Sequence, residues 1–241
     1  MKKSFILFVL FILVSFSIFA ERIVGTDKLE YNQKTQLYHY GNEKEPFTGI
    51  EKAYYEDKSL KYELPYKNGK FDGKAIEYYP SGKIESESFY VNGKLNGKSI
   101  EYYKNGNLKS DGNYKDGKRD GLTKTYFEDG TIRSEIYYKN GELDGLAKEY
   151  FGNGQVFIQE NYKNGELDGP AKEYYENGIL KVERFYKNDK LEGISKIYYP
   201  SGKLQVEVNF KDNEADGILR EYDETGKIIN QETYKNGQLI D

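Results

Sequence analysis

The sequence predicts an all-β protein, an elongated single-sheet antiparallel meander of tandem 24-residue β-hairpin repeats. Three observations predict this fold. A glycine recurs every 24 residues from Gly49 to Gly217, with no insertion. Each interval holds an aromatic doublet followed by turn residues, as in Tyr102-Tyr103 before Asn105-Gly106. Tyrosine and glycine each occur 25 times in 241 residues, and glycine every ten or so residues excludes long helices.

Residues 1–20 have the pattern of a secretory signal peptide. Lys2 and Lys3 precede an apolar run of 15 residues from Phe5 to Phe19, and the small residue Ala20 follows. An uncleaved membrane anchor is the alternative, but the run is shorter than the ~20 residues that a spanning helix needs. We expect cleavage near Ala20 and export to the periplasm, the cell surface or the medium.

Residues 21–48 do not match the repeat and are predicted to form a degenerate N-terminal cap. Gln36–Tyr40 is expected to be a strand and Gly41–Pro46 a loop. An array of hairpins needs such an end because an open edge strand pairs with other chains. Residues 49–241 then form eight tandem units.

Each unit is predicted to contain two strands joined by a first turn and closed by a second. In Tyr79-Pro80-Ser81-Gly82, proline and glycine favour a type I turn followed by a left-handed glycine. The equivalent turn in the next unit would place Tyr102 opposite Leu108, and Glu101 opposite Lys109. The glycine that opens each unit is predicted to shape a turn. This set comprises Gly73, Gly97, Gly121, Gly145, Gly169, Gly193 and Gly217.

The unit Asp-Gly-x-x-x-Glu-Tyr-Tyr-x-Asn-Gly-x-Leu, closed by Tyr-Lys-Asn-Gly-x-Leu, resembles the variant of the membrane occupation and recognition nexus (MORN) repeat. More narrowly, it is similar to the bacterial YwqK-like family described as antitoxins of toxin–antitoxin systems. The resemblance covers residues 47–241. It implies an elongated sheet of hairpins and an antitoxin-like, non-enzymatic interaction role. Similar repeats accompany lipid kinases, but this chain has no phosphate-cradling loop or kinase motif.

Composition argues against catalysis, and we expect no enzyme activity, cofactor or metal. The chain has no cysteine and one histidine, His39. Carboxylates recur at the same position in six of the eight units, whereas an acid–base pair needs two different environments. The acidic residues before the unit glycines suit turns better than Ca²⁺. They are Asp72, Asp120, Asp144, Asp168, Glu192 and Asp216.

The second ring of each doublet is the candidate contact residue, because successive strand residues point to opposite faces and the first ring is expected to pack in the core. The candidates are Tyr79, Tyr103, Phe127, Phe151, Tyr175 and Tyr199. Two functions stay open: a platform for another protein, or a cell-surface protein that binds glycans through these rings. A net charge of -4 argues against nucleic acid and opposes binding to anionic lipid.

Overall fold

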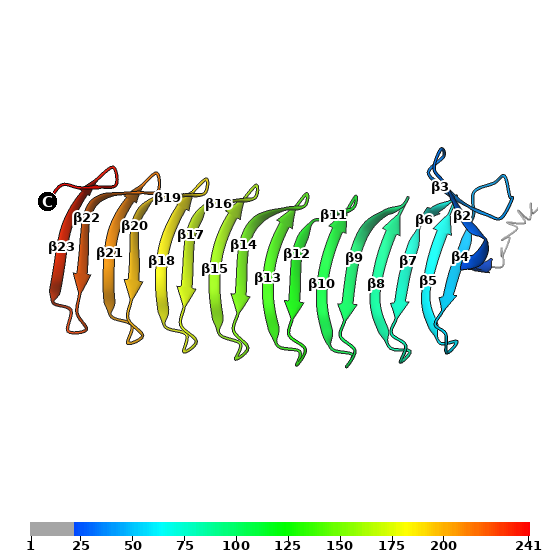
Figure 1. The fold of residues 1–241 in the computed structure, drawn as a ribbon, viewed down its shortest axis with the longest axis horizontal. Coiled ribbons are helices and arrows are strands. Elements are labelled where there is room, and N and C mark those ends of the chain that lie inside the picture. The colour runs from blue at the N-terminus through cyan, green and yellow to red at the C-terminus, as the bar shows by residue number, and fades with distance from the viewer. Residues whose placement is uncertain (1–21) are drawn as a thin grey trace, which may run out of the picture.

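The computed structural model describes residues 22–241, and most of their strands belong to one long, open sheet (Figure 1). From β4 onward, neighbouring strands follow one another in sequence, and the sheet has 22 strands. The all-β, elongated single-sheet prediction is therefore confirmed. The predicted signal peptide at residues 1–20 lies outside the described residues. Within residues 22–241, no helix is long and apolar enough to cross a membrane.

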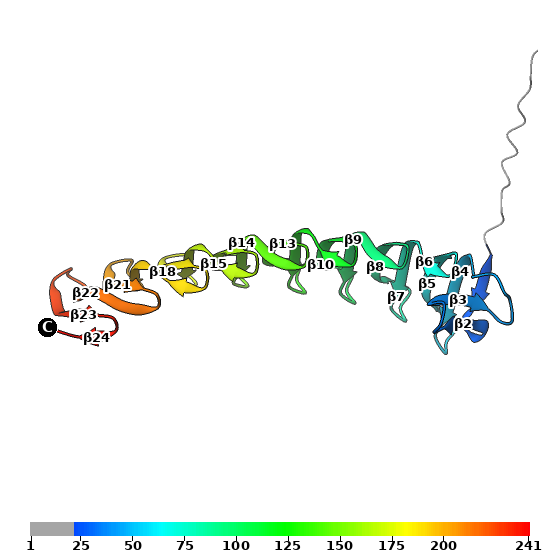
Figure 2. The ribbon, with the colours of Figure 1, turned by 90° about the horizontal axis from the view of Figure 1, so that it is seen from above.

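The N-terminal cap differs from a degenerate hairpin unit. Its elements are β1 (Ile23–Gly25), the 3-10 helix η1 (Thr26–Lys28), β2 (Leu29–Asn32) and β3 (Leu37–Tyr40). The β1 strand pairs in parallel with the first repeat strand, with Ile23 opposite Ile50. The β2–β3 hairpin forms a separate sheet beside this end of the array (Figure 2). The strand at β3 was predicted, whereas β1 and β2 were not.

Each of the eight units contributes two main strands. The first strands are β4 (Gly49–Tyr54), β7 (Gly73–Tyr78), β9 (Lys94–Tyr102), β12 (Gly121–Tyr126), β14 (Glu142–Tyr150), β17 (Gly169–Tyr174), β20 (Gly193–Tyr198) and β22 (Glu214–Tyr222). The second strands are β5 (Leu60–Lys67), β8 (Ile84–Val91), β10 (Leu108–Lys115), β13 (Ile132–Lys139), β15 (Val156–Lys163), β18 (Leu180–Lys187), β21 (Leu204–Lys211) and β23 (Ile228–Lys235). After five of the second turns, a short strand precedes the next main strand. These are β6 (Lys70–Phe71), β11 (Lys118–Arg119), β16 (Glu166–Leu167), β19 (Lys190–Leu191) and β24 (Gln238–Leu239).

The first turn has the predicted geometry. Gly106 N donates to Tyr103 O at 2.8 Å, and Gly106 has φ +98°. Tyr102 lies opposite Leu108, as expected, but Glu101 lies opposite Ser110 because Lys109 forms a bulge. The predicted backbone pairing of Glu101 with Lys109 is therefore wrong by one residue. Their side chains still form an ion pair, with Lys109 Nζ 2.9 Å from Glu101 Oε2.

The second turn takes left-handed conformations at both central residues, as a type I′ turn requires. Asn140 has φ +52° and Gly141 φ +91°. Asp189 and Asn213 replace the glycine with φ +61° and +72°, so the turn survives these substitutions as predicted.

The seven glycines predicted to shape turns lie instead at bulges inside the sheet. At Gly145, φ is +116°, and the register shifts so that Tyr137 faces three residues, 144–146. Bulges and turns both need positive φ, which glycine adopts without strain, so the sequence signal is the same for both. The bulges interrupt the strands, which is one reason why the sheet has more strands than the sixteen of a simple meander.

The register defines two faces of the sheet. In the fourth unit, Tyr126 pairs with Ile132 and Lys124 with Glu135 on what we call the first face. Thr125 pairs with Ser134 on the second face, which also carries the second ring of each doublet.

The tightest packing lies at the cap. Val24, Phe47 and Tyr66 form a buried cluster, and Phe47 is only 1% exposed. The first rings of the doublets, expected to form the core, are half-buried along the array, and Tyr54 is 59% exposed. In a single-layered sheet each ring packs only against side chains of the adjacent strands, so each ring is only partly buried.

Candidate functional site

The second rings of the doublets join each unit to the next. Tyr103 Oη donates to the carbonyl oxygen of Tyr126 at 2.7 Å. The same bond runs from Tyr79 to Tyr102 and from Tyr175 to Tyr198. It recurs from Tyr199 to Tyr222. All of these candidate rings are half-buried, so they contribute to cohesion between units and also expose part of each ring.

Two candidates in this row are phenylalanines and cannot make that bond. Phe151 packs against Phe157 instead, with ring centroids 5.0 Å apart. Arg133 lies over Phe127, its guanidinium carbon 5.9 Å from the ring centroid. The row of second rings is therefore continuous, but its links between units are not identical.

This difference predicts the effect of Tyr103→Phe. We expect a loss of about 1 kcal/mol in the free energy of unfolding, because the substitution removes one hydrogen bond and leaves the Tyr126 carbonyl unpartnered. Chemical denaturation measures it. Phe127→Tyr is the matched variant, since it restores the bond found in the other units and should be neutral or stabilising. Equal destabilisation by both variants would argue against the role of the hydroxyl.

The first face carries a ladder of opposite charges. Lys124 Nζ lies 2.7 Å from Glu135, and Tyr150 Oη donates to the same carboxylate at 2.8 Å. Lys124 and then Tyr150 hold the pKa of Glu135 below its ordinary value. Arg220 and Tyr222 share Glu207 in the same way, at 3.1 and 2.7 Å. Each carboxylate thus links its own hairpin to the first strand of the next hairpin. Each ion pair contributes modestly to stability because it is partly solvated.

Carboxylates before the unit glycines cap the next second turn. Asp72 accepts a hydrogen bond from Asn92 N at 3.0 Å, and Glu192 accepts one from Asp212 N at 3.0 Å. Within residues 22–241, no group of three or more histidine or acidic residues is placed to hold a metal ion. The carboxylates have a structural explanation in these bonds.

Sequence reasoning missed a row of exposed rings on the first face. Phe89, Tyr137 and Phe185 are 45%, 45% and 44% exposed. They recur every 48 residues, in alternate units. Asn161 takes the intervening position and donates to the carbonyl of Pro170 at 2.7 Å. Asn113 and Asn209 do likewise with the carbonyls of Leu122 and Asp216. A search for a period of two units, rather than one, finds this signal.

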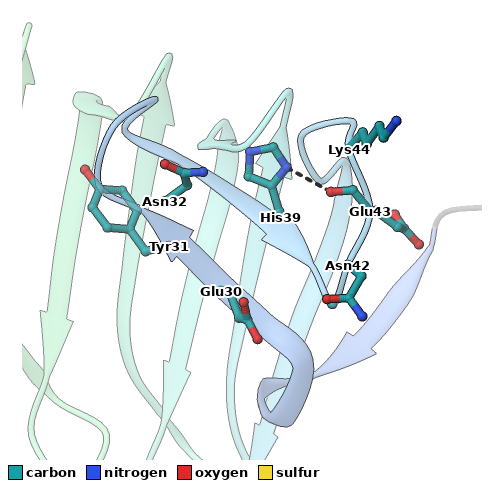
Figure 3. Close-up of a pocket in the computed structure, with 8 residues that line it drawn as sticks. Glu30, Tyr31, Asn32, His39, Asn42, Glu43 and Lys44 are labelled. Atoms are coloured by element: carbon teal, nitrogen blue, oxygen red, sulfur yellow. Dashed lines mark hydrogen bonds between the residues drawn. The ribbon is translucent and has the colours of Figure 1, made fainter.

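The cap contains an open hollow of about 500 Å³ (Figure 3). His39 stands in it, with Nδ1 3.3 Å from the carbonyl oxygen of Glu43. Its Nε2 is buried without a hydrogen-bond partner in the described part of the chain. Glu30, Tyr31 and Asn42 line the rim.

A second hollow, of about 390 Å³, lies on the second face at the middle of the array. We call it the central hollow. Arg119, Arg133 and Lys109 border it together with Tyr103. It thus contains one of the rings that the sequence proposed as a contact residue, and it adds arginines that the sequence reasoning had not singled out.

The tyrosines predict how the stability depends on alkaline pH. Burial, followed by the charge of Glu51, raises the pKa of Tyr62 from 10.0 to about 12. Burial and then Glu135 raise the pKa of Tyr150 to about 12. A raised pKa in the fold means that the stabilisation is complete below pH 10 and is lost as the pH rises through 12. We expect the free energy of unfolding to fall across this range.

Ultraviolet absorbance of tyrosinate measures the effect. The folded chain should titrate at higher pH than the chain in denaturant, which serves as the control. Overlapping titration curves would contradict the prediction.

The sequence matches the family described as MORN repeat variant in eight segments. They span residues 47–68, 71–92, 95–116, 119–140, 143–164, 167–188, 191–212 and 215–236. A search of curated proteins gave no match. The eight segments coincide with the eight hairpin units of the sheet, and the chain belongs to the MORN repeat variant family.

Proposed function

We propose that this chain is an exported, non-catalytic repeat protein whose extended β surface binds another protein. The row of exposed apolar side chains on the first face carries the proposal. The same row continues past Phe185 into later units, where Ile194 and Ile218 lie opposite Asn209 and Thr233 and are 56% and 41% exposed. Exposed apolar groups in one row typify protein-binding surfaces, and aromatic rings contribute most of the energy there.

The narrower proposal is an antitoxin-like role, supported by the resemblance to the YwqK-like family. An exported antitoxin needs a toxin outside the cytoplasm as well. Export is tested by fractionating cells that express the full chain or a chain without residues 1–20. Equal retention of both in the cytosol would contradict it.

Binding is tested by cross-linking the full chain in the cells that carry its gene, followed by titration of the purified partner. Tyr137→Asn should weaken binding, and it should preserve the fold because Asn113 and Asn161 occupy the same position in neighbouring units. Phe157→Asn, on the second face, is the matched control. Equal effects of the two variants would contradict the assignment of the first face as the binding surface.

The second candidate function is glycan binding through the second rings of the doublets. Hydrogen bonds to the backbone fix the orientation of Tyr79, Tyr103 and Tyr175, and fixed rings bind sugars at little entropic cost. Glycan-array binding that disappears in Tyr103→Ala, with no protein partner found, would favour this function over the first.

A further inference from the structure

At the central hollow, a charged residue replaces an apolar residue of the repeat on the second face. Residue 119 is arginine, whereas other units have Leu95, Leu143 or Leu167 at this position. The floor of the hollow is polar. Ser110, Thr125 and Ser134 are opposite one another in the register. The equivalent row further along the sheet is Val182, Ile197 and Val206. The row is also polar on the N-terminal side, where Glu77 lies opposite Ser86 and Ser86 opposite Glu101, so Arg119 is what distinguishes the hollow from the neighbouring units.

The two arginines come from opposite ends of the strands. Arg119 follows a second turn, and its Nε donates to Tyr114 Oη at 3.2 Å. Its guanidinium carbon lies 5.3 Å from the centroid of the Tyr138 ring. Arg133 follows a first turn and lies over Phe127. Aromatic contacts hold a guanidinium in place but leave its edge free to donate in plane.

Neither guanidinium has a carboxylate partner among the described residues. Arg22 and Arg220, by contrast, pair with Glu43 and Glu207 at 2.7 and 3.1 Å. At the hollow, Lys109 neutralises Glu101 at 2.9 Å, and Glu149 stands exposed at the rim. The two arginines therefore share the hollow with one carboxylate residue, Glu149, that has no ion-pair partner among the described residues. The polar floor supplies hydroxyl groups, and Thr125 and Ser134 already bond to each other at 2.6 Å.

We propose that the central hollow binds a carboxylate side chain from an acidic segment of a protein partner. Arg119 and Arg133 donate to the carboxylate from two sides, in the planar geometry that guanidinium and carboxylate groups share. This inference rests on the proposed function, because it names the chemistry of the protein that the sheet binds. A chain of net charge -4 repels acidic peptides in general, so attraction to one requires a local site.

Isothermal titration calorimetry of the full chain with an oligo-glutamate peptide tests the proposal. An oligo-glutamine peptide of equal length is the control ligand. The double variant Arg119→Leu, Arg133→Gln keeps residues that other units carry at these positions, Leu143 and Gln205. We expect the oligo-glutamate peptide to bind the double variant at least about tenfold more weakly, since each charge-assisted contact contributes on this scale.

Arg184→Gln removes one positive charge from another unit and should leave binding unchanged. Equal weakening by this control would show a non-specific charge effect and overturn the site. No binding of oligo-glutamate, or tighter binding of inorganic phosphate, would overturn the carboxylate assignment.

The failure of the site and of the proposed function are distinguishable. If the purified partner binds the double variant as tightly as the original chain, the inference fails while the protein-binding function stands. If oligo-glutamate binds through the two arginines but cross-linking finds no protein partner, the site stands and the proposed function fails.

Discussion

Phe47→Ala is expected to lower the free energy of unfolding of the N-terminal cap by about 3–5 kcal/mol, the usual effect of truncating a fully buried phenylalanine. The Phe47 ring is 1% exposed and lies 5.6 Å from the Tyr66 ring, centroid to centroid. Its removal leaves a cavity where the array has its most buried cluster. Because the remaining units share burial thinly, they offer no second core to compensate.

Chemical denaturation of the full chain, followed by hydrogen exchange of the cap amides, measures this effect. Phe157→Ala is the matched control, since that ring is 36% exposed and lies in the middle of the array. We expect the control to cost less than half as much, in proportion to the smaller area buried. Similar losses for the two variants would mean that the cap does not hold the principal core.

The repeating part of the fold could be predicted from the sequence because its signals are local. Pro80 and Gly82 determine a turn within four residues, and Tyr78 and Ile84 then follow as partners. The cap could not be predicted in this way. The pairing of β1 with β4 joins Ile23 to Ile50 in parallel, and no turn or period connects residues so far apart.

For the candidate sites, too, local features could be predicted and contacts between units could not. Alternation along the strand placed Tyr103 on one face, but it did not reveal that the Tyr103 hydroxyl bonds to the next unit. The central hollow is lined by Arg119, from a second turn, and by Arg133, from a first turn in the following unit. Their proximity arises from strand pairing across units, so residue spacing alone does not disclose it.

Gly69→Asn is expected to be destabilising, although asparagine is accepted at the same turn position elsewhere. Gly69 has φ +74°, and Asn213 takes φ +72° in the equivalent place, so the backbone conformation itself suits asparagine. The difference lies in the surroundings. A Cβ atom on residue 69 would come within 2.8 Å of Leu37 Cβ and 2.9 Å of the Tyr38 carbonyl oxygen.

Gly141→Asn is the matched control, because the closest atom to its added Cβ would be Lys118 Cβ at 3.5 Å. We expect Gly69→Asn to lower the free energy of unfolding by about 1–3 kcal/mol, the usual cost of overpacking, and Gly141→Asn to cost well below 1 kcal/mol. Gly69 also bonds through its N–H to the Phe47 carbonyl at 2.7 Å and through its own carbonyl to Tyr38 N at 2.9 Å. A shift that relieves the clash therefore strains both bonds. If the two variants unfold at the same denaturant concentration, the cap does not pack on the Gly69 turn as described. Contact with the cap is the difference between the surroundings of Gly69 and Gly141.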